Sequence, residues 1–180
     1  MKRRAETLRA RVGGREVMTA GTRTMELTIS RTIPASPAEV FEAWLDPKHP
    51  GNPWTDADKL IFNPRVDGLF FFMHVSMVGT KDARAQHDTA FGLESGEQRA
   101  HYGRFVAIER SKRIQYTWMS KFTRGLESMV TVIFEKNGSD TLVTLNHANL
   151  PDDEQGALHE GGWNKCLDVF GEQFRAESPR

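Results

Sequence analysis

The segment from Pro151 to about Ala176 constrains the fold of this chain more than any other stretch. Its aromatic and apolar side chains recur at intervals of three or four residues, at His159, Trp163, Leu167, Phe170 and Phe174. On a helix this spacing places all of them on one stripe, and the acidic residues 152–154 suit the positive end of the helix dipole. Because such a stripe must be buried, we expect a large apolar surface elsewhere in the chain to cover it.

The rest of the chain supplies that surface mainly as strands. Residues 25–33 alternate apolar and polar side chains, which is typical of a half-buried strand. Further strand patterns occupy residues 60–62, 69–75, 101–108, 113–119, 128–134 and 141–147. The Asn-Gly-Ser-Asp sequence at 137–140 predicts a hairpin between the last two. One early helix is predicted after Ser36, which forms a capping box with Glu39.

The order of strand, helix, several strands and long helix indicates an α+β fold in one domain, residues 24–176. We predict that a curved antiparallel sheet wraps around the C-terminal helix. Residues 1–23 are rich in arginine and predict a basic, disordered tail. Residues 79–100 are polar, small and charged, and predict a long mobile loop or lid over the domain.

Four motifs in a fixed order carry a resemblance to a known family. They are residues 33–44 (IPASPAEVFEAW), 64–70 (PRVDGLF), 103–118 (which end in YTW), and 147–151 (HANLP) followed by His159 and Gly162-Trp163. Together they resemble the SRPBCC (START-like) superfamily, and within it the AHSA1-like bacterial proteins similar to the C-terminal domain of the Hsp90 ATPase activator. The resemblance covers about Met25 to Phe174 and implies a helix-grip (START/Bet v 1-like) fold.

The sequence also departs from the family pattern in places that bear on a binding site. A single tryptophan, Trp54, stands where the family has a pair after the first helix. Asp67 and Asn149 replace glycines of the family motifs, and the 79–100 insert is longer than usual. These differences leave the entrance of a family-like pocket undefined by sequence.

Strand alternation places Phe70, Phe72 and His74 on one face and Ile114, Tyr116 and Trp118 on another. If both faces meet the last helix, they enclose either a ligand cavity or a close-packed core. Given the resemblance, we favour the cavity for the set as a whole. The candidate ligand-binding residues are Trp44, Trp54, Phe70, Phe72, His74, Tyr116, Trp118, His159, Trp163 and Phe170.

The chain has six histidines and one cysteine, Cys166. The histidines show no paired ligand spacing, so we expect no metal and no cofactor. No nucleophile with an adjacent base is evident, which leaves His74, His101 and His159 as weak candidates for proton transfer. We interpret Cys166 as a buried small hydrophobe beside the helix stripe.

Lys plus Arg and Asp plus Glu both total 24, so the surface gives no general attraction to nucleic acid or to an anionic membrane. The chain lacks a spanning segment and a secretory signal, and we expect a cytoplasmic protein. Three functions remain open. They are binding of an apolar or amphipathic small molecule, a cyclase- or hydrolase-like enzyme in the same cavity, and an Hsp90-activator-like interaction. We expect no chaperone partner because no second domain accompanies this one, and a homodimer stays open.

Overall fold

The computed structural model of the chain describes residues 11–12, 15–16, 23–82, 85–90 and 92–177. Within them the elements run β1 (Arg11–Val12), β2 (Arg15–Glu16), β3 (Thr24–Ile33), α1 (Pro37–Leu45), β4 (Lys59–Phe62), β5 (Leu69–Val75), α2 (Ala85–Ala90), β6 (Gln98–Glu109), β7 (Arg113–Ser120), the 3₁₀ turn η1 (Lys121–Thr123), β8 (Ser128–Asn137), β9 (Asp140–Pro151) and α3 (Glu154–Glu177). Most of the predicted tail, residues 1–23, lies outside the described residues.

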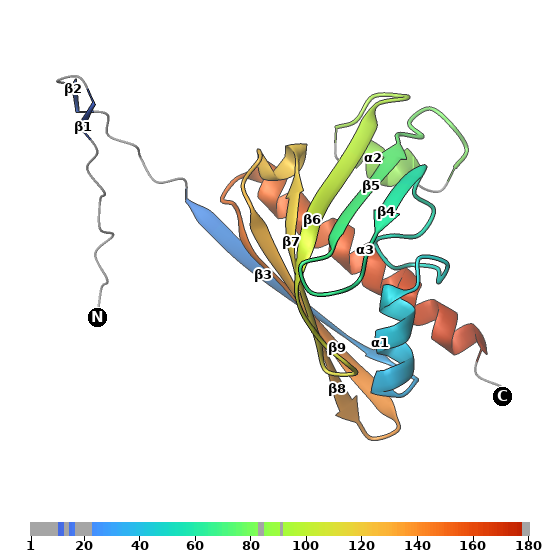
Figure 1. The fold of residues 1–180 in the computed structure, drawn as a ribbon. Coiled ribbons are helices and arrows are strands. Elements are labelled where there is room, and N and C mark those ends of the chain that lie inside the picture. Colours follow the sequence, from blue (N-terminus) through green and yellow to red (C-terminus); the bar gives the residue numbers. More distant parts are fainter. Residues whose placement is uncertain (1–10, 13–14, 17–22, 83–84, 91, 178–180) are drawn as a thin grey trace.

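Seven strands form one antiparallel sheet in the order β3-β9-β8-β7-β6-β5-β4 (Figure 1). The first strand of this sheet, β3, pairs with its last strand in the sequence, β9, so the two ends of the domain close against each other. Register shifts between Met25 and Leu27 and between Phe105 and Ala107 add local twist. The sheet therefore curves, as predicted.

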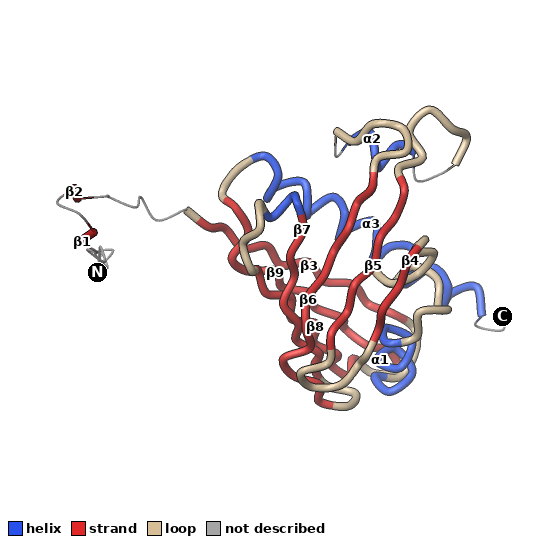
Figure 2. The backbone as a smooth tube through the Cα atoms, turned by 45° about the horizontal axis from the view of Figure 1, so that its top comes forward, coloured by secondary structure: helices blue, strands red, loops and turns tan. Residues whose placement is uncertain are grey.

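Helix α3 crosses the inner face of this curved sheet (Figure 2). All five residues of the predicted stripe are buried, with Leu167 and Phe170 fully inaccessible and Trp163 only 4% exposed. The predicted α+β helix-grip architecture is confirmed. The helix begins three residues later than the sequence pattern indicated, because Pro151 still pairs with Thr24 as the end of β9. Asp153 then accepts hydrogen bonds from the backbone N–H groups of Gln155 and Gly156.

Helix α1 packs between α3 and the far end of β8. Its N-terminus carries the predicted capping box of Ser36 and Glu39. The ring of Phe41 meets Phe134 of β8 edge-on at 5.5 Å, and Trp44 meets Phe170 of α3 edge-on at 5.2 Å. Helix α1 thus fills the space beside the C-terminal half of α3 and leaves the N-terminal half uncovered by a second helix.

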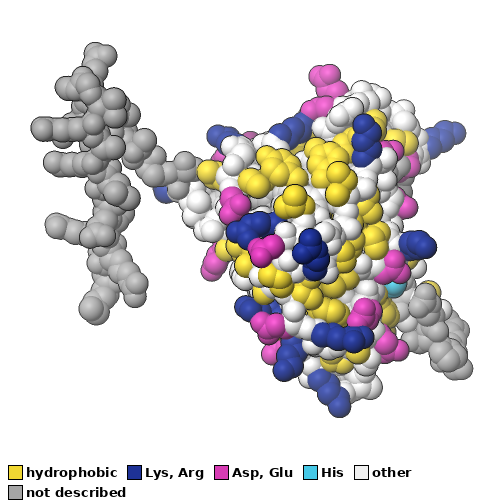
Figure 3. Space-filling view, in the orientation of Figure 1, with side chains coloured by type: hydrophobic (Ala, Val, Ile, Leu, Met, Phe, Trp, Pro, Cys, Tyr) yellow, Lys and Arg dark blue, Asp and Glu magenta, His cyan; other side chains and the backbone are white. Residues whose placement is uncertain are grey.

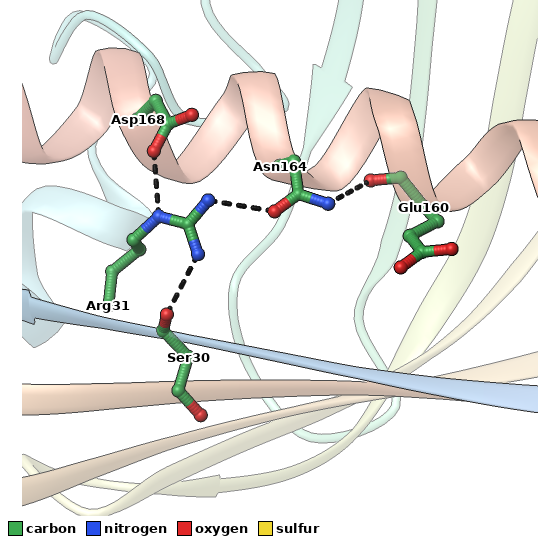
Figure 4. A network of polar contacts seen from close by, with 5 residues as sticks. All are labelled: Ser30, Arg31, Glu160, Asn164 and Asp168. Atoms are coloured by element: carbon green, nitrogen blue, oxygen red, sulfur yellow. Dashed lines mark hydrogen bonds and ion pairs between the residues drawn. The ribbon is translucent and has the colours of Figure 1, made fainter.

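A polar network ties the outer side of α3 to the edge strand β3 (Figure 4). Arg31 donates from Nε to Asp168 Oδ1 and from a terminal nitrogen to Asn164 Oδ1, both at 2.7 Å. Asn164 in turn donates to the carbonyl oxygen of Glu160, one turn earlier on the helix. These groups are partly exposed, so the network contributes modestly to stability. Its two-point guanidinium contact fixes the position of α3 along β3.

The insert predicted at 79–100 contains the short helix α2, and strand β6 begins inside it at Gln98. Asp88 of α2 is buried, pairs with Arg99 at 3.1 Å and accepts a hydrogen bond from the backbone N–H of Met77. None of the helices in the described parts of the chain has the length and apolar composition to cross a membrane.

Candidate functional site

A pocket of about 280 Å³ opens between the N-terminal half of α3, strands β5 to β7 and the loop after α1. This is the region that α1 leaves uncovered. The lining residues are Gly51, Asn52, Pro53, Thr55, Asp56, Phe72, His74, Arg99, His101, Trp118, His159, Gly162, Trp163, Lys165, Cys166 and Val169. Apolar walls with a few convergent polar groups are the usual composition of small-molecule sites.

The walls of the pocket are aromatic rings from three elements. Phe72 of β5 stacks on His101 of β6 at 4.8 Å and lies 5.5 Å from Trp118 of β7. Trp118 lies 5.1 Å from Trp163 of α3, so sheet and helix meet through two indoles. This arrangement presents flat π-faces and ring edges to any molecule that enters the pocket.

A buried hydrogen-bond chain behind the wall holds the indole of Trp163 and ends on the backbone of Trp118. Trp163 donates from Nε1 to His147 Nδ1 at 2.9 Å. Because that nitrogen accepts, the neutral imidazole carries its proton on Nε2 and donates to Ser128 Oγ at 2.8 Å. Ser128 then donates to the backbone carbonyl of Trp118 at 2.6 Å. His147 is fully buried, and burial, followed by the nearby charge of His159, holds its pKa well below the usual range.

Three further imidazoles, those of His74, His101 and His159, line the pocket itself. Burial lowers the pKa of His101 well below its usual value, and the positive charge of Arg99 lowers it further. Burial also lowers the pKa of His159, whose Nδ1 donates to the backbone carbonyl of Gln155 at 2.9 Å. At neutral pH both rings are uncharged, and a neutral imidazole can donate and accept a hydrogen bond at once.

The polar rim of the pocket combines charges of both signs. Arg99 lines the pocket and is paired with Asp88 of the insert, so its positive charge is already compensated. Asp56 and Lys165 contribute one charge each. Burial raises the pKa of the Cys166 thiol to about 12, and its Sγ–H group donates to the carbonyl of Gly51 at 3.0 Å. Cys166 is therefore a protonated thiol and not a nucleophile.

Five predicted ligand-binding residues do not line the pocket: Trp44, Trp54, Phe70, Tyr116 and Phe170. They form the packed core beneath α1. Trp54 is at its centre, with ring contacts to five aromatic residues and an Nε1–H group that donates to the Trp44 carbonyl at 2.8 Å. Burial also raises the pKa of Tyr116 well above its usual value. A ligand-binding role for these five stays a prediction.

The remaining predicted residues, Phe72, His74, Trp118, His159 and Trp163, come together at the pocket, as does the weak catalytic candidate His101. From the loop 51–56 the sequence interpretation named only Trp54, which does not line the pocket, and it missed Arg99. It also missed Gly162, Cys166 and Val169, which follow His159 at helical spacing and form a second stripe beside the buried one. That periodicity was the available signal for the helix side of the site.

Among the residues that the structure describes, no group of three or more His, Cys, Asp or Glu side chains is arranged to hold a metal ion. His147 and His159 approach to 5.2 Å between ring centroids. Both nitrogens of His147 are already used in the hydrogen-bond chain, so the pair is not a ligand set.

Two residues that replace glycines of the family motifs share one backbone conformation. Asp67 and Asn149, which replace glycines of those motifs, both adopt left-handed backbone with φ of +61°. Aspartate and asparagine tolerate this conformation better than other residues with a side chain. Both residues therefore occupy positions whose backbone conformation glycine also adopts readily.

Comparisons with known proteins agree with this architecture. Residues 34–174 match the family described as Activator of Hsp90 ATPase homolog 1-like protein. Similar solved structures include protein CV1439 from Chromobacterium violaceum, with 18% identity, TM-score 0.64, and coverage of 83% of this chain and 96% of that one. The AHSA1-like protein from Aeromonas hydrophila has 20% identity, TM-score 0.60, and coverage of 84% and 93%.

DynU16, described as a protein in the dynemicin biosynthetic locus, shares 14% identity and a TM-score of 0.61. The match covers 86% of this chain but 48% of DynU16. At this level of identity the likeness to solved structures is one of fold. No curated protein matches the chain.

Proposed function

The chain belongs to the family of Activator of Hsp90 ATPase homolog 1-like proteins, and from this premise we propose that it binds an apolar or amphipathic small molecule between α3 and strands β5 to β7. The observation that carries the proposal is the pocket, with Phe72, Trp118 and Trp163 as walls. Its volume of about 280 Å³ lies near the lower end of ligand sites. It suits a compact ring system better than a long lipid chain.

The polar groups of the pocket suggest how such a ligand is oriented. Neutral imidazoles of His101 and His159 converge with the rim charges on one space, where they can satisfy a hydroxyl, carbonyl or carboxyl group of the ligand. An aromatic body would lie against the two indoles. The proposed ligand is therefore amphipathic, with one polar end.

Binding can be measured by native mass spectrometry and by a thermal-shift screen of lipid extracts and aromatic compounds. Val169 lines the pocket and is half-buried, so Val169→Phe should fill part of the space and weaken binding about tenfold or more. Glu172→Phe is the matched control, because it adds the same ring to the exposed side of α3. It should bind like the wild type.

Two results would contradict the proposal. One is the absence of any mass increment or stabilising compound for the wild-type protein. The other is a confirmed ligand whose affinity is the same for Val169→Phe as for Glu172→Phe, because that ligand must bind elsewhere.

A cyclase- or hydrolase-like activity in the same pocket is the second candidate function. The observation that favours it is the presence of three imidazoles, His74, His101 and His159, on the pocket surface. The fold of DynU16, described as part of a biosynthetic locus, is compatible with it. The test is turnover of a confirmed ligand by His74→Gln, His101→Gln and His159→Gln variants. Unchanged turnover in all three would exclude proton transfer by these residues.

A further inference from the structure

Two of the rings that line the pocket carry a buried nitrogen without a hydrogen-bond partner. Among the described residues, nothing accepts from Nε1 of Trp118, and Nδ1 of His101 has neither a donor nor an acceptor. Both nitrogens are shielded from solvent, and the two residues are only 5% and 7% exposed. Such atoms are rare, because the hydrogen bond to water is lost on folding and nothing replaces it. Two of them in one pocket wall indicate that a bound molecule supplies the missing partner.

The surroundings of the two rings leave the pocket as the side from which a partner can come. The ring centroids of His101 and Trp118 lie 4.7 Å apart. Phe72 stacks on His101 and lies 5.5 Å from Trp118, and Trp163 lies 5.1 Å from Trp118. His147 also approaches Trp118, but both of its ring nitrogens are already used in the buried hydrogen-bond chain. A rotation about χ2, a broad torsion in histidine and tryptophan, turns either nitrogen towards a molecule in the pocket.

The outer face of the sheet lacks this combination. Figure 3 shows apolar side chains gathered there, and Ile61 and Leu69 are each more than 60% exposed. In the part of the chain that the structure describes, however, none of the residues that line the shallow groove on that face has a shielded polar atom without a partner. The pocket beneath α3 is therefore the stronger candidate for a polar ligand group.

The chemistry of the two nitrogens defines that group. An indole Nε1–H only donates, so Trp118 needs an acceptor. Burial and the charge of Arg99 hold the pKa of His101 well below its usual value, so its ring is neutral and one nitrogen can accept. A hydroxyl oxygen accepts from Trp118 and donates to His101 at the same time. A carboxylate would bring a charge into this wall, where the nearby Arg99 is already paired with Asp88.

We propose that the ligand of this pocket is an aromatic compound of the phenol type, whose ring hydroxyl accepts from Trp118 Nε1 and donates to His101. The inference rests on the proposed function and specifies the polar end of the ligand. Its ring would lie against Phe72 and Trp163. The aromatic walls and the volume of about 280 Å³ suit a compact ring system in that position.

Equilibrium dialysis of the full chain against naphthalene, 2-naphthol and 2-naphthoate tests the proposal. The wild type should bind 2-naphthol about tenfold or more tightly than naphthalene, because the hydroxyl gains two hydrogen bonds. Trp118→Phe and His101→Phe each keep an aromatic ring but remove one of these bonds, so each should lose most of the preference. The preference is a ratio within one variant, so a change of pocket shape affects both compounds. Glu172→Phe adds a ring on the exposed side of α3 and should keep the wild-type preference.

Three results would overturn this inference while naphthalene still binds and Val169→Phe still weakens its binding, which would leave the proposed function standing. One is equal affinity of the wild type for 2-naphthol and naphthalene. Another is tighter binding of 2-naphthoate than of 2-naphthol, because the polar end would then be an anion. The third is a preference for 2-naphthol that persists in both Trp118→Phe and His101→Phe. If none of the three compounds bound the wild type, the inference and the proposed function would both fail.

Discussion

Replacing His147 with glutamine should make the stability of this protein less sensitive to acid. In the native protein His147 is fully buried, accepts from Trp163 and donates to Ser128. A second ring proton would meet the N–H group of Trp163 and would be buried without an acceptor. Glutamine offers one carbonyl oxygen and one amide N–H group, so it can replace both hydrogen bonds but cannot titrate.

The sign and size of the effect follow from the lowered pKa of His147. A histidine whose folded pKa lies below its unfolded value of about 6.5 contributes stability above that pH, and the contribution is lost as the pH falls. While the ring stays neutral in the folded protein, one such histidine lowers the free energy of unfolding by about 1.4 kcal/mol as the pH falls from about 7.5 to about 5.5. His101 and His159, whose pKa values are also lowered, add to the loss in the wild type and in the variant alike.

Urea unfolding followed by tryptophan fluorescence gives the free energy of unfolding at each pH. Between these two pH values the His147→Gln protein should lose about 1.4 kcal/mol less than the wild type. Ser128→Ala is the control, since it weakens the same chain but keeps the titrating ring. It should be less stable at both pH values and show the wild-type pH dependence. Equal acid sensitivity of wild type and His147→Gln would refute the argument.

Three further substitutions test the packing around the site by thermal or urea unfolding. Trp54→Ala removes the centre of the aromatic core and should lower the free energy of unfolding by about 3–5 kcal/mol. A decrease of less than about 1 kcal/mol would mean that the core is not close-packed around Trp54. Asn149→Ala should lower the free energy of unfolding by about 1 kcal/mol, because residue 149 has a positive φ that alanine tolerates poorly. Asn149→Gly should be at least as stable as the wild type. If Asn149→Ala were the more stable of the two variants, the backbone argument would be contradicted. Gly51→Ala should lower the free energy of unfolding by about 2 kcal/mol or more. The added Cβ would lie 2.4 Å from the backbone nitrogen of Phe170, and the φ of residue 51 is +85°. An unchanged stability would show that the loop can move away from α3.

The sequence predicts most of the fold because its patterns are local. The stripe of α3 follows from 3.6-residue periodicity, and each large strand follows from alternation. The capping box of α1 and the turn at 138–139 are equally local and were predicted at the observed positions. The ends of strands were predicted less well, as β6 begins at Gln98 and β9 continues to Pro151. These ends are set by pairing with Val75 and Thr24, which are distant in sequence.

The candidate site was only partly predictable for the same reason. Alternation correctly placed Phe72, Trp118 and their neighbours on the inner face of the sheet. It could not separate the residues that line the pocket from those that fill the core, because that division depends on where the loop after α1 lies. Asn52 fixes that loop by donating to the Ala43 and Asp46 carbonyls and accepting from the backbone N–H of Trp54. No periodic pattern in the sequence encodes these contacts.

The interior is close-packed beside the C-terminal half of α3 and contains the pocket beside the N-terminal half, and the positions of the helices and tryptophans explain this difference. Helix α1 has nine residues and reaches only the C-terminal half of α3, where Trp44 meets Phe170 and Trp54 fills the remaining space. Over the other half, α3 faces the curved sheet without a second helix. There Trp163 cannot rotate into the empty space without giving up its hydrogen bond to His147, a loss of about 1–3 kcal/mol for a buried donor. The buried polar chain therefore holds the wall of the pocket in place, which explains why the structure keeps a cavity where apolar packing alone would favour collapse.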